Sequence, residues 1–103
     1  MKSILHDKKE GTCYLCKLLY FDYSVKKTTE HHIICGTSGR KMSERYGLKV
    51  YLCSRHHGEK GSEDVHRPDL NDYDDLLRRI AQSKFEQTHT RKEWRDTFIK
   101  SYL

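Results

Sequence analysis

Two pairs of metal-binding side chains constrain the fold of this chain more than any other feature of its sequence. Cys13 and Cys16 form the first pair, Cys53 and His56 form the second, and two residues separate the members of each pair. Two such pairs, far apart in the sequence, supply the four sulfur and nitrogen ligands that complete a tetrahedron around Zn²⁺. The sequence therefore predicts one structural zinc ion, bound by all four residues, that ties the two segments together.

Two alternatives for the cysteines remain open at this point. In the first, Cys35 replaces His56 and gives a site of four cysteines. Cys35 has no second ligand at the same spacing, however, and is more simply explained as a small buried apolar residue. In the second, Cys13 and Cys16 are free thiols. Disulfides are disfavoured, because four cysteines in a reducing compartment indicate metal binding.

A zinc ion would compensate for a small hydrophobic core. The chain has 103 residues, enough for one domain. Only 35% of them are apolar, against roughly 45–50% in ordinary globular domains. Domains with so little apolar mass commonly need a metal or a disulfide for stability. Zinc binding contributes on the order of 10 kcal/mol in small zinc modules, which is enough to outweigh the thin core.

The charge balance and the absence of apolar segments limit the partners of the chain. Lysine and arginine outnumber aspartate and glutamate by 20 to 15, which gives a net charge of +5. This balance suits a polyanionic partner such as nucleic acid, and it is equally compatible with a solvated surface. The first residues lack the apolar segment of a signal peptide, and no run of about 18 apolar residues could span a membrane. We therefore expect a cytoplasmic protein without a membrane partner.

Short strands and a short helix are predicted for the middle of the chain. Residues 30–35 and 48–52 alternate along the chain in the pattern that is typical of strands. Residues 40–46 are predicted to form a short helix that ends at Gly47 in the left-handed conformation. Residues 18–21 are too few and too aromatic for a helix prediction, and we assign them to a strand.

The N-terminal end of the chain is predicted to be less well ordered than the C-terminal end. Residues 1–11 are polar, and we expect a loosely held arm. Residues 69–87 carry apolar side chains at helical spacing after Asp69, a suitable N-cap. Thr90 and Glu93 form a capping box that opens a last helix. The single predicted domain, 1–103, therefore has three parts: the arm over 1–11, a core over 12–67 and two supporting helices over 69–103.

Adjacent histidines in two places indicate a second site. His31 and His32 are neighbours in the first predicted strand, and His57 directly follows the predicted zinc ligand His56. Successive side chains of a strand point to opposite faces, so His31 and His32 can serve different roles. Imidazole is both a good ligand for first-row transition metals and a base near neutral pH.

These motifs together resemble the HNH nucleases, also called ββα-metal or His-Me finger nucleases, and in particular the small phage and prophage members. The matching segments are Cys13-x-x-Cys16, Glu30-His31-His32-Ile33, Arg40-Lys41-x-Ser43-Glu44-x-Tyr46-Gly47-Leu48 and Leu52-Cys53-x-x-His56-His57. The resemblance covers residues 11–103 and implies an α+β fold, in which a zinc-stapled ββα-metal core is followed by C-terminal helices. It also implies an endonuclease that hydrolyses DNA in the cytoplasm of a bacterial host cell.

The resemblance assigns a role to four histidines. In this family the residue before the general base binds the divalent ion, which implies that His31 is a ligand and His32 is the catalytic base. His57 matches the ligand at the start of the family's helix, and His66 is the third ligand. Ligation by imidazole suits Mn²⁺, Ni²⁺ or Zn²⁺ better than Mg²⁺ as the catalytic cation.

One residue of the family motif is absent. The Asn that orients the base in many HNH nucleases has no counterpart between His32 and Cys53, and Leu48 stands near its place. Two outcomes are open: a backbone carbonyl holds the imidazole instead, or catalysis is weak or lost. In the second case the chain would be a zinc-stapled DNA-binding module or an accessory recombination protein.

Four basic residues flank the expected active site and are candidates for contacts with DNA phosphates. They are Arg40, Lys41, Arg45 and Lys49. Such contacts position the DNA backbone without reading its sequence, and a solvated helix face is the competing explanation for each of them. Neither the oligomeric state nor the form of the DNA substrate follows from these patterns.

Overall fold

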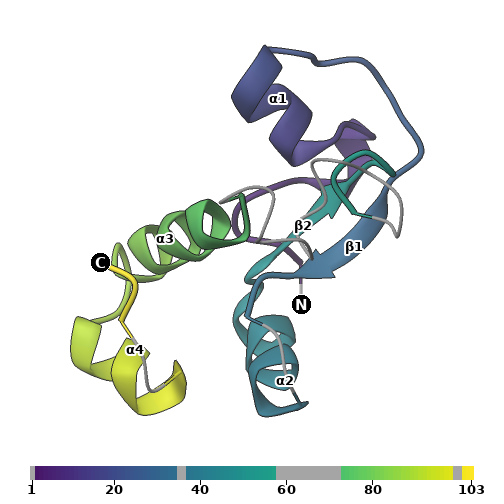
Figure 1. Cartoon of the computed structure of the whole chain (residues 1–103). Helices are drawn as coiled ribbons and strands as arrows, with labels where there is room; N and C mark the ends of the chain where they lie inside the picture. The colour runs from purple at the N-terminus through teal and green to yellow at the C-terminus, as the bar shows by residue number, and fades with distance from the viewer. Residues whose placement is uncertain (1, 35–36, 58–72, 99–100) are drawn as a thin grey trace.

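The chain forms a small α+β fold built around one two-stranded sheet (Figure 1). The structure is a computed structural model that describes residues 2–34, 37–57, 73–98 and 101–103. In chain order the elements are a 3₁₀ turn (Lys8–Glu10), α1 (Tyr14–Tyr20), β1 (Thr29–His32), α2 (Thr37–Tyr46), β2 (Lys49–Leu52), α3 (Tyr73–Phe85) and α4 (Arg91–Phe98). No helix within these ranges is long and apolar enough to cross a membrane.

The sheet sets the two adjacent histidines opposite two residues of β2. Strands β1 and β2 are antiparallel neighbours, with His31 opposite Val50 and His32 opposite Lys49. Helix α2 connects the strands and lies at the end of the sheet away from α1 (Figure 1). The two predicted strands and the helix between them are found, but β1 ends at His32, before residues 33 and 34 of the predicted strand, and α2 begins three residues earlier than predicted. Gly47 follows α2 with a φ of 69°, so the predicted left-handed stop is confirmed as well.

The segment around residues 18–21 is helical, and the strand predicted there is wrong. Helix α1 begins at Tyr14, inside the first ligand pair. Leu15 and Cys16 are buried and Leu19 packs on the core, which is the spacing of one helical face. A prediction that starts at residue 18 misses this face, because its first two members, Leu15 and Cys16, lie within the Cys13-x-x-Cys16 motif.

The N-terminal residues lie along the outer edge of β2, so the expectation of a loosely held arm does not hold for the described part of it. The Ser3 hydroxyl donates to the Lys49 carbonyl, and the Tyr51 amide donates to His6 Nδ1 over 3.2 Å. An open strand edge exposes backbone donors and acceptors, and this segment satisfies two of them. His6 is consequently only 4% exposed.

The core joins the sheet to the C-terminal helices. Trp94 of α4 is fully buried, and its ring centroid lies 5.3 Å from that of Phe85 of α3. The predicted capping box is confirmed, because the Glu93 amide donates to the Thr90 hydroxyl and the Thr90 amide donates to the Glu93 carboxylate, each over 3.1 Å. The predicted helix before it is observed as α3, and its expected N-cap Asp69 lies outside the described residues. Other large, fully buried side chains are Leu15, Ile33, Leu48, Val50, Leu52 and Leu77.

Replacing Gly47 with Ala should destabilise the fold. The left-handed conformation costs a residue with a Cβ about 1–2 kcal/mol. The added Cβ would also overlap the Lys2 carbonyl and lie 3.2 Å from the Ile4 side chain. We expect urea unfolding to show a free energy of unfolding lower by about 1 kcal/mol or more.

Ser83→Ala, at an exposed position of α3, is the control and should change the free energy of unfolding by less than about 0.5 kcal/mol. Equal stability of Gly47→Ala and the wild type would show that the N-terminal segment does not pack against this turn.

Candidate metal centre and active site

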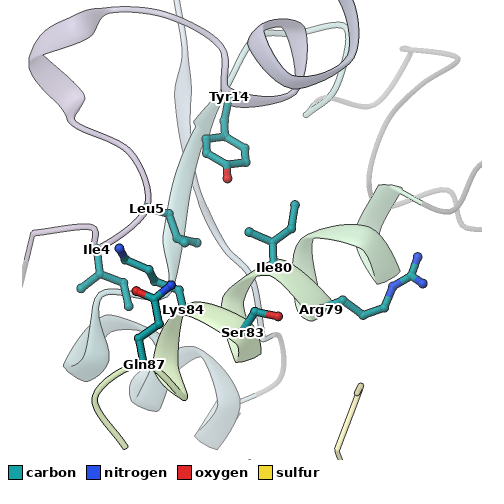
Figure 2. Close-up of a pocket in the computed structure, with 8 residues that line it drawn as sticks. All are labelled: Ile4, Leu5, Tyr14, Arg79, Ile80, Ser83, Lys84 and Gln87. Atoms are coloured by element: carbon teal, nitrogen blue, oxygen red, sulfur yellow. The ribbon is translucent and has the colours of Figure 1, made fainter.

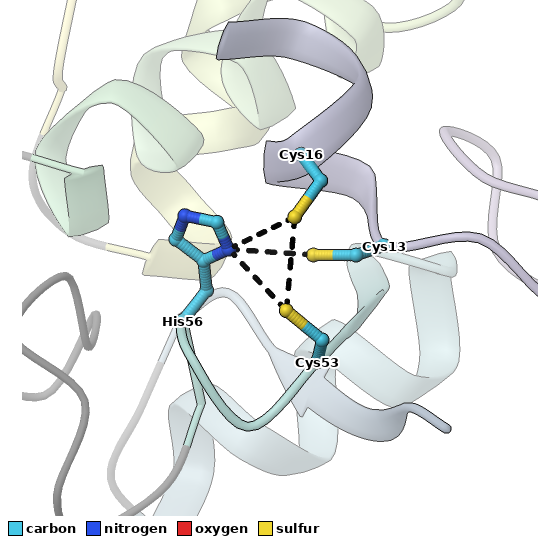
Figure 3. A group of neighbouring side chains, drawn as sticks. All are labelled: Cys13, Cys16, Cys53 and His56. Carbon is cyan, nitrogen blue, oxygen red and sulfur yellow. Dashed lines mark hydrogen bonds between the residues drawn. The ribbon is translucent and has the colours of Figure 1, made fainter. Parts of the chain in front are cut away.

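The four predicted zinc ligands meet at one buried point (Figure 3). Cys13 and Cys16 come from the start of α1, while Cys53 and His56 come from the turn that follows β2. His56 Nδ1 lies 3.4 Å from Cys13 Sγ, 3.6 Å from Cys16 Sγ and 3.7 Å from Cys53 Sγ. The Sγ atoms of Cys16 and Cys53 are 3.7 Å apart.

These separations fit a tetrahedral zinc ion. Bonds of about 2.3 Å to sulfur and about 2.0 Å to nitrogen place two sulfur ligands about 3.8 Å apart, and a sulfur and a nitrogen about 3.5 Å apart. The separations in the cluster agree with these values to within about 0.2 Å. All four residues are at most 7% exposed. The predicted ligand set can therefore hold a structural zinc ion.

The surroundings of the cluster favour metal-bound thiolates. Burial raises the pKa of the Cys13 thiol, and a bound cation would favour its ionised form. Burial also acts to raise the pKa of Cys53, but the backbone amide of Arg55 and the neighbouring thiols outweigh it, and the net pKa is lowered. The Lys26 ammonium lies 3.2 Å from Cys16 Sγ. It offsets the single negative charge that three thiolates leave around Zn²⁺.

His31, on one face of β1, lies next to His57, which follows β2 in the chain. His31 is 2% exposed, and its ring centroid lies 5.0 Å from that of His57. Thr29 Oγ1 is hydrogen-bonded to His57 Nδ1 at 2.6 Å, which orients the ring and makes Nε2 the nitrogen that can ligate a metal. Asp74 of α3 supplies a carboxylate 3.9 Å from His31 Nε2. Two predicted ligands thus meet beside an acidic residue that was not among the predicted site residues.

No sequence pattern singles out Asp74 as part of a site. An acidic residue in the first turn of a helix is favoured by the helix dipole. Asp74 also forms an ion pair of 2.8 Å with Arg78 one turn later, so it has an ordinary structural explanation. His66, the third predicted ligand, lies outside the described residues, as does Cys35.

The opposite face of the sheet carries His32 within a cluster of charged residues. His32 Nε2 lies 2.8 Å from Glu44 Oε2 and 3.3 Å from Glu30 Oε1. Lys49, the partner of His32 on β2, places its ammonium 2.9 and 3.0 Å from the two carboxylate oxygens of Glu44 and 3.3 Å from Glu30. The pleat of β1 thus puts His31 and His32 on different faces, as the alternation predicts.

An open depression of about 780 Å³ lies on the His32 face. It is lined by Glu30, His32, Ser38, Arg40, Lys41 and Glu44. The predicted base therefore shares a surface with two of the predicted phosphate contacts, both exposed on α2. Arg45 is also exposed, with its guanidinium 5.7 Å from the centroid of the Tyr46 ring. Lys49 differs from the other three, because its side chain is only 7% exposed and its ammonium contacts carboxylates.

A second cleft, of about 440 Å³, lies between the N-terminal segment and α3 (Figure 2). Leu5, Tyr14 and Ile80 extend into this cleft (Figure 2). None of the residues predicted for catalysis, metal binding or DNA binding lines it. We therefore assign the candidate active site to the two faces of the sheet and not to this cleft.

Comparison with protein-family models, with curated proteins and with solved structures finds no match for this chain. A functional assignment therefore depends on the motif residues and on the arrangement of the two faces. That arrangement offers a structural metal centre, two imidazoles beside a carboxylate on one face, and an imidazole–carboxylate pair beside basic side chains on the other.

Cys13→Ser should release the zinc ion and unfold the protein. The cluster ties the start of α1 to the end of β2, and the core is too small to hold the two without it. Metal content measured by atomic emission and thermal unfolding followed by circular dichroism would test both effects. Cys35→Ser is the matched control, because it makes the same change at the cysteine outside the predicted ligand set, and it should retain one zinc ion per chain. A full zinc equivalent and normal melting in Cys13→Ser would rule out this site.

Proposed function

We propose that this chain is an HNH endonuclease that hydrolyses phosphodiester bonds of DNA with one divalent ion. The pairing of His31 with His57 is the observation that supports this most directly. His57 directly follows the cluster ligand His56, yet its ring faces a different histidine, 5.0 Å away. A structural zinc module needs only one histidine of this adjacent pair, so the other is left for a separate site.

His31 and His57 would hold the divalent ion with Asp74 beside them, and His66 is the further ligand that the family resemblance implies. Imidazole and carboxylate donors together suit Mn²⁺, Ni²⁺ or Zn²⁺ better than Mg²⁺. When bound, such an ion supplies charge stabilisation for the phosphate and for the leaving 3′ oxygen. The structural zinc ion takes no part, because four protein ligands leave it no open position.

His32 would act as the general base. A neutral imidazole can take a proton from water near neutral pH. Because His31 and His32 point to opposite faces, the scissile phosphate would lie at the outer edge of β1, where groups from both faces can reach it. Within the described residues β1 has no neighbouring strand on that side, so a nucleic-acid backbone can approach.

Basic side chains would hold the DNA backbone beside His32. Arg40 and Lys41 line the same depression as His32, and Arg45 is exposed on the same helix. Phosphate contacts of this kind position DNA without reading its sequence, and the net charge of +5 supports a polyanionic partner. On the resemblance to phage and prophage proteins, we propose that the activity belongs to the cytoplasm of a bacterial host.

A second candidate function is that of a zinc-stapled DNA-binding module or accessory recombination protein without catalysis. Two observations favour it: the motif Asn is absent, and the proposed base and the proposed metal ligand next to it lie on opposite faces of the sheet. The basic residues of α2 would have the same role in this case. The two candidates differ in whether DNA is cut.

A plasmid-nicking assay should separate the roles of the neighbouring histidines. We expect the zinc-loaded wild type to nick supercoiled DNA when Mn²⁺, Ni²⁺ or Mg²⁺ is added. His32→Ala and His57→Ala should each lower the rate about 100-fold or more, while the zinc content and the melting temperature stay at wild-type values. His56→Ala should instead lose zinc and unfold, because it removes a ligand of the structural cluster.

His89→Gln is the matched control for this assay, since the ring contacts described for His89 are with Phe85 and Tyr46 and not with the proposed catalytic residues, and it should nick at the wild-type rate. Wild-type nicking by His32→Ala would show that the base is assigned wrongly. DNA binding without nicking in any of the three metals would favour the non-catalytic module.

Arg40→Gln should weaken DNA binding by about the same factor for every sequence, because a phosphate contact carries no sequence information. The slope of log affinity against log salt should fall by about 1. Fluorescence anisotropy at several salt concentrations would measure both quantities. Lys92→Gln removes an exposed lysine of α4 that pairs with Asp96 at 2.9 Å, and it should leave the slope unchanged. An unchanged slope in Arg40→Gln would show that Arg40 does not contact a DNA phosphate.

A further inference from the structure

Glu44 holds the imidazole of His32 from the helix that follows β1. Its Oε2 atom lies 2.8 Å from His32 Nε2, which is the length of a charge-assisted hydrogen bond. Glu44 belongs to α2 and is 12 residues from His32 in sequence, so the contact results from the fold and not from local chain geometry. A carboxylate can only accept a hydrogen bond, so Nε2 carries the proton in this contact.

Lys49 in turn fixes the carboxylate of Glu44. Its ammonium lies 3.0 Å from one carboxylate oxygen and 2.9 Å from the other. Burial acts to lower the pKa of Lys49, but the carboxylates of Glu44 and Glu30 outweigh it, so the pKa is raised and the ammonium stays charged. The hydrogen bond from His32 and that from Lys49 lower the pKa of Glu44 to about 2. At neutral pH the Lys49 ammonium therefore contacts the Glu44 carboxylate, and this carboxylate accepts a hydrogen bond from the His32 imidazole.

The donor set of this cluster would also suit a metal ion, but Lys49 argues against one. The ligand atoms of Glu30, His32 and Glu44 lie within 4.8 Å of one another. The Lys49 ammonium already contacts both carboxylates and supplies the positive charge that an ion would bring. A divalent ion at the same place would meet strong like-charge repulsion from a buried ammonium. The cluster is therefore better suited to orienting an imidazole than to binding a metal.

We propose that Glu44 is a positioning residue for the general base, holding His32 as the Nε2–H tautomer while Lys49 holds Glu44. A carboxylate from α2 thus takes the place of the motif Asn that this chain lacks. In this arrangement Lys49 contacts Glu44 and not a DNA phosphate. The catalytic consequence rests on the proposed endonuclease function, whereas the tautomer itself does not.

The tautomer determines which ring nitrogen of His32 can accept a proton from water. With the proton on Nε2, the lone pair of the neutral ring is on Nδ1. In the hydrolytic step an O–H bond of water breaks and the proton moves to Nδ1. The hydroxide then bonds to phosphorus, and the 3′ oxygen leaves and takes a proton from solvent. The Glu44 carboxylate stabilises the imidazolium that forms, as the buried aspartate does in serine proteases. Glu44 acts through His32 and does not itself contact DNA.

The tautomer of His32 can be measured in ¹⁵N-labelled, zinc-loaded protein without DNA or a second metal. We expect long-range ¹H–¹⁵N spectra of the neutral ring to show a protonated Nε2 and an unprotonated Nδ1. Glu44→Gln should keep this tautomer, because its amide oxygen accepts the same hydrogen bond. Glu44→Ala leaves only the more distant Glu30 carboxylate, 3.3 Å from Nε2, and should give a mixture of the two tautomers.

Glu10→Gln is the matched control for these variants. The Glu10 side chain is 43% exposed against 45% for Glu44. It accepts two bonds from Lys17, of 2.9 and 3.1 Å, and lies 3.5 Å from the imidazole of His6. The control therefore breaks a similar group of charges that has no contact with His32, and the His32 spectrum should not change.

Nicking kinetics would test the catalytic consequence. Glu44→Ala should lower kcat about 10- to 100-fold with little change in KM for DNA. Glu44→Gln should recover part of that loss, and Glu10→Gln should match the wild type. A merely structural role would lower the melting temperature without changing the tautomer, and Gln would restore no activity.

The possible results separate the positioning role from the endonuclease function. A proton on Nδ1 in the wild type, or an unchanged tautomer in Glu44→Ala, would overturn the positioning role whether or not the chain cuts DNA. A bound Mn²⁺ equivalent that Glu44→Gln removes would overturn it in favour of a metal site. If Glu44→Ala changes the tautomer but the wild type never nicks DNA, the positioning contact stands and the endonuclease function is refuted.

Discussion

The cluster of Cys13, Cys16, Cys53 and His56 is the interaction on which the rest of the structure depends. It joins the start of α1 to the turn after β2, and so closes a chain whose apolar residues make only a small core. Metal binding in such a cluster is coupled to folding, because four ligands converge only in the folded chain. The turn that carries His56 also carries His57, so the same cluster sets the position of the second histidine pair.

The two faces of the sheet have different chemical character because their neighbours differ. On one face His31 lies beside His57 and an acidic residue of α3, the group that we propose as the site of the divalent ion. On the other face, Lys49 is buried beside the carboxylates of Glu44 and Glu30, and both carboxylates also contact His32. A buried ammonium is tolerated only when anionic partners compensate for the lost hydration. The resulting charge network places a carboxylate oxygen 2.8 Å from His32 Nε2.

Much of the fold could be predicted from local patterns, and the wrong predictions for α1 and for the N-terminal segment have a common cause. The two strands, the helix before Gly47 and the capping box of α4 all follow from residues close together in the chain. Helix α1 was missed because its apolar face begins within the metal-binding pair. The N-terminal segment was expected to be loose because its polar side chains have no obvious partner in sequence. Its partners are backbone groups of β2, which only the sheet presents.

The sequence by itself determined which four residues could bind a structural zinc ion, because the spacing within each pair is a local property of the chain. The alternation of side chains along a strand likewise determined that His31 and His32 point to opposite faces of the sheet. Only the tertiary structure decided that Asp74 would lie beside His31, that Glu44 would contact His32, and that Lys49 would contact Glu44. Charged residues on helices and strands have ordinary explanations at the surface. Which of them meet across the sheet depends on how α2 and α3 pack, and the packing energy is set by the whole core.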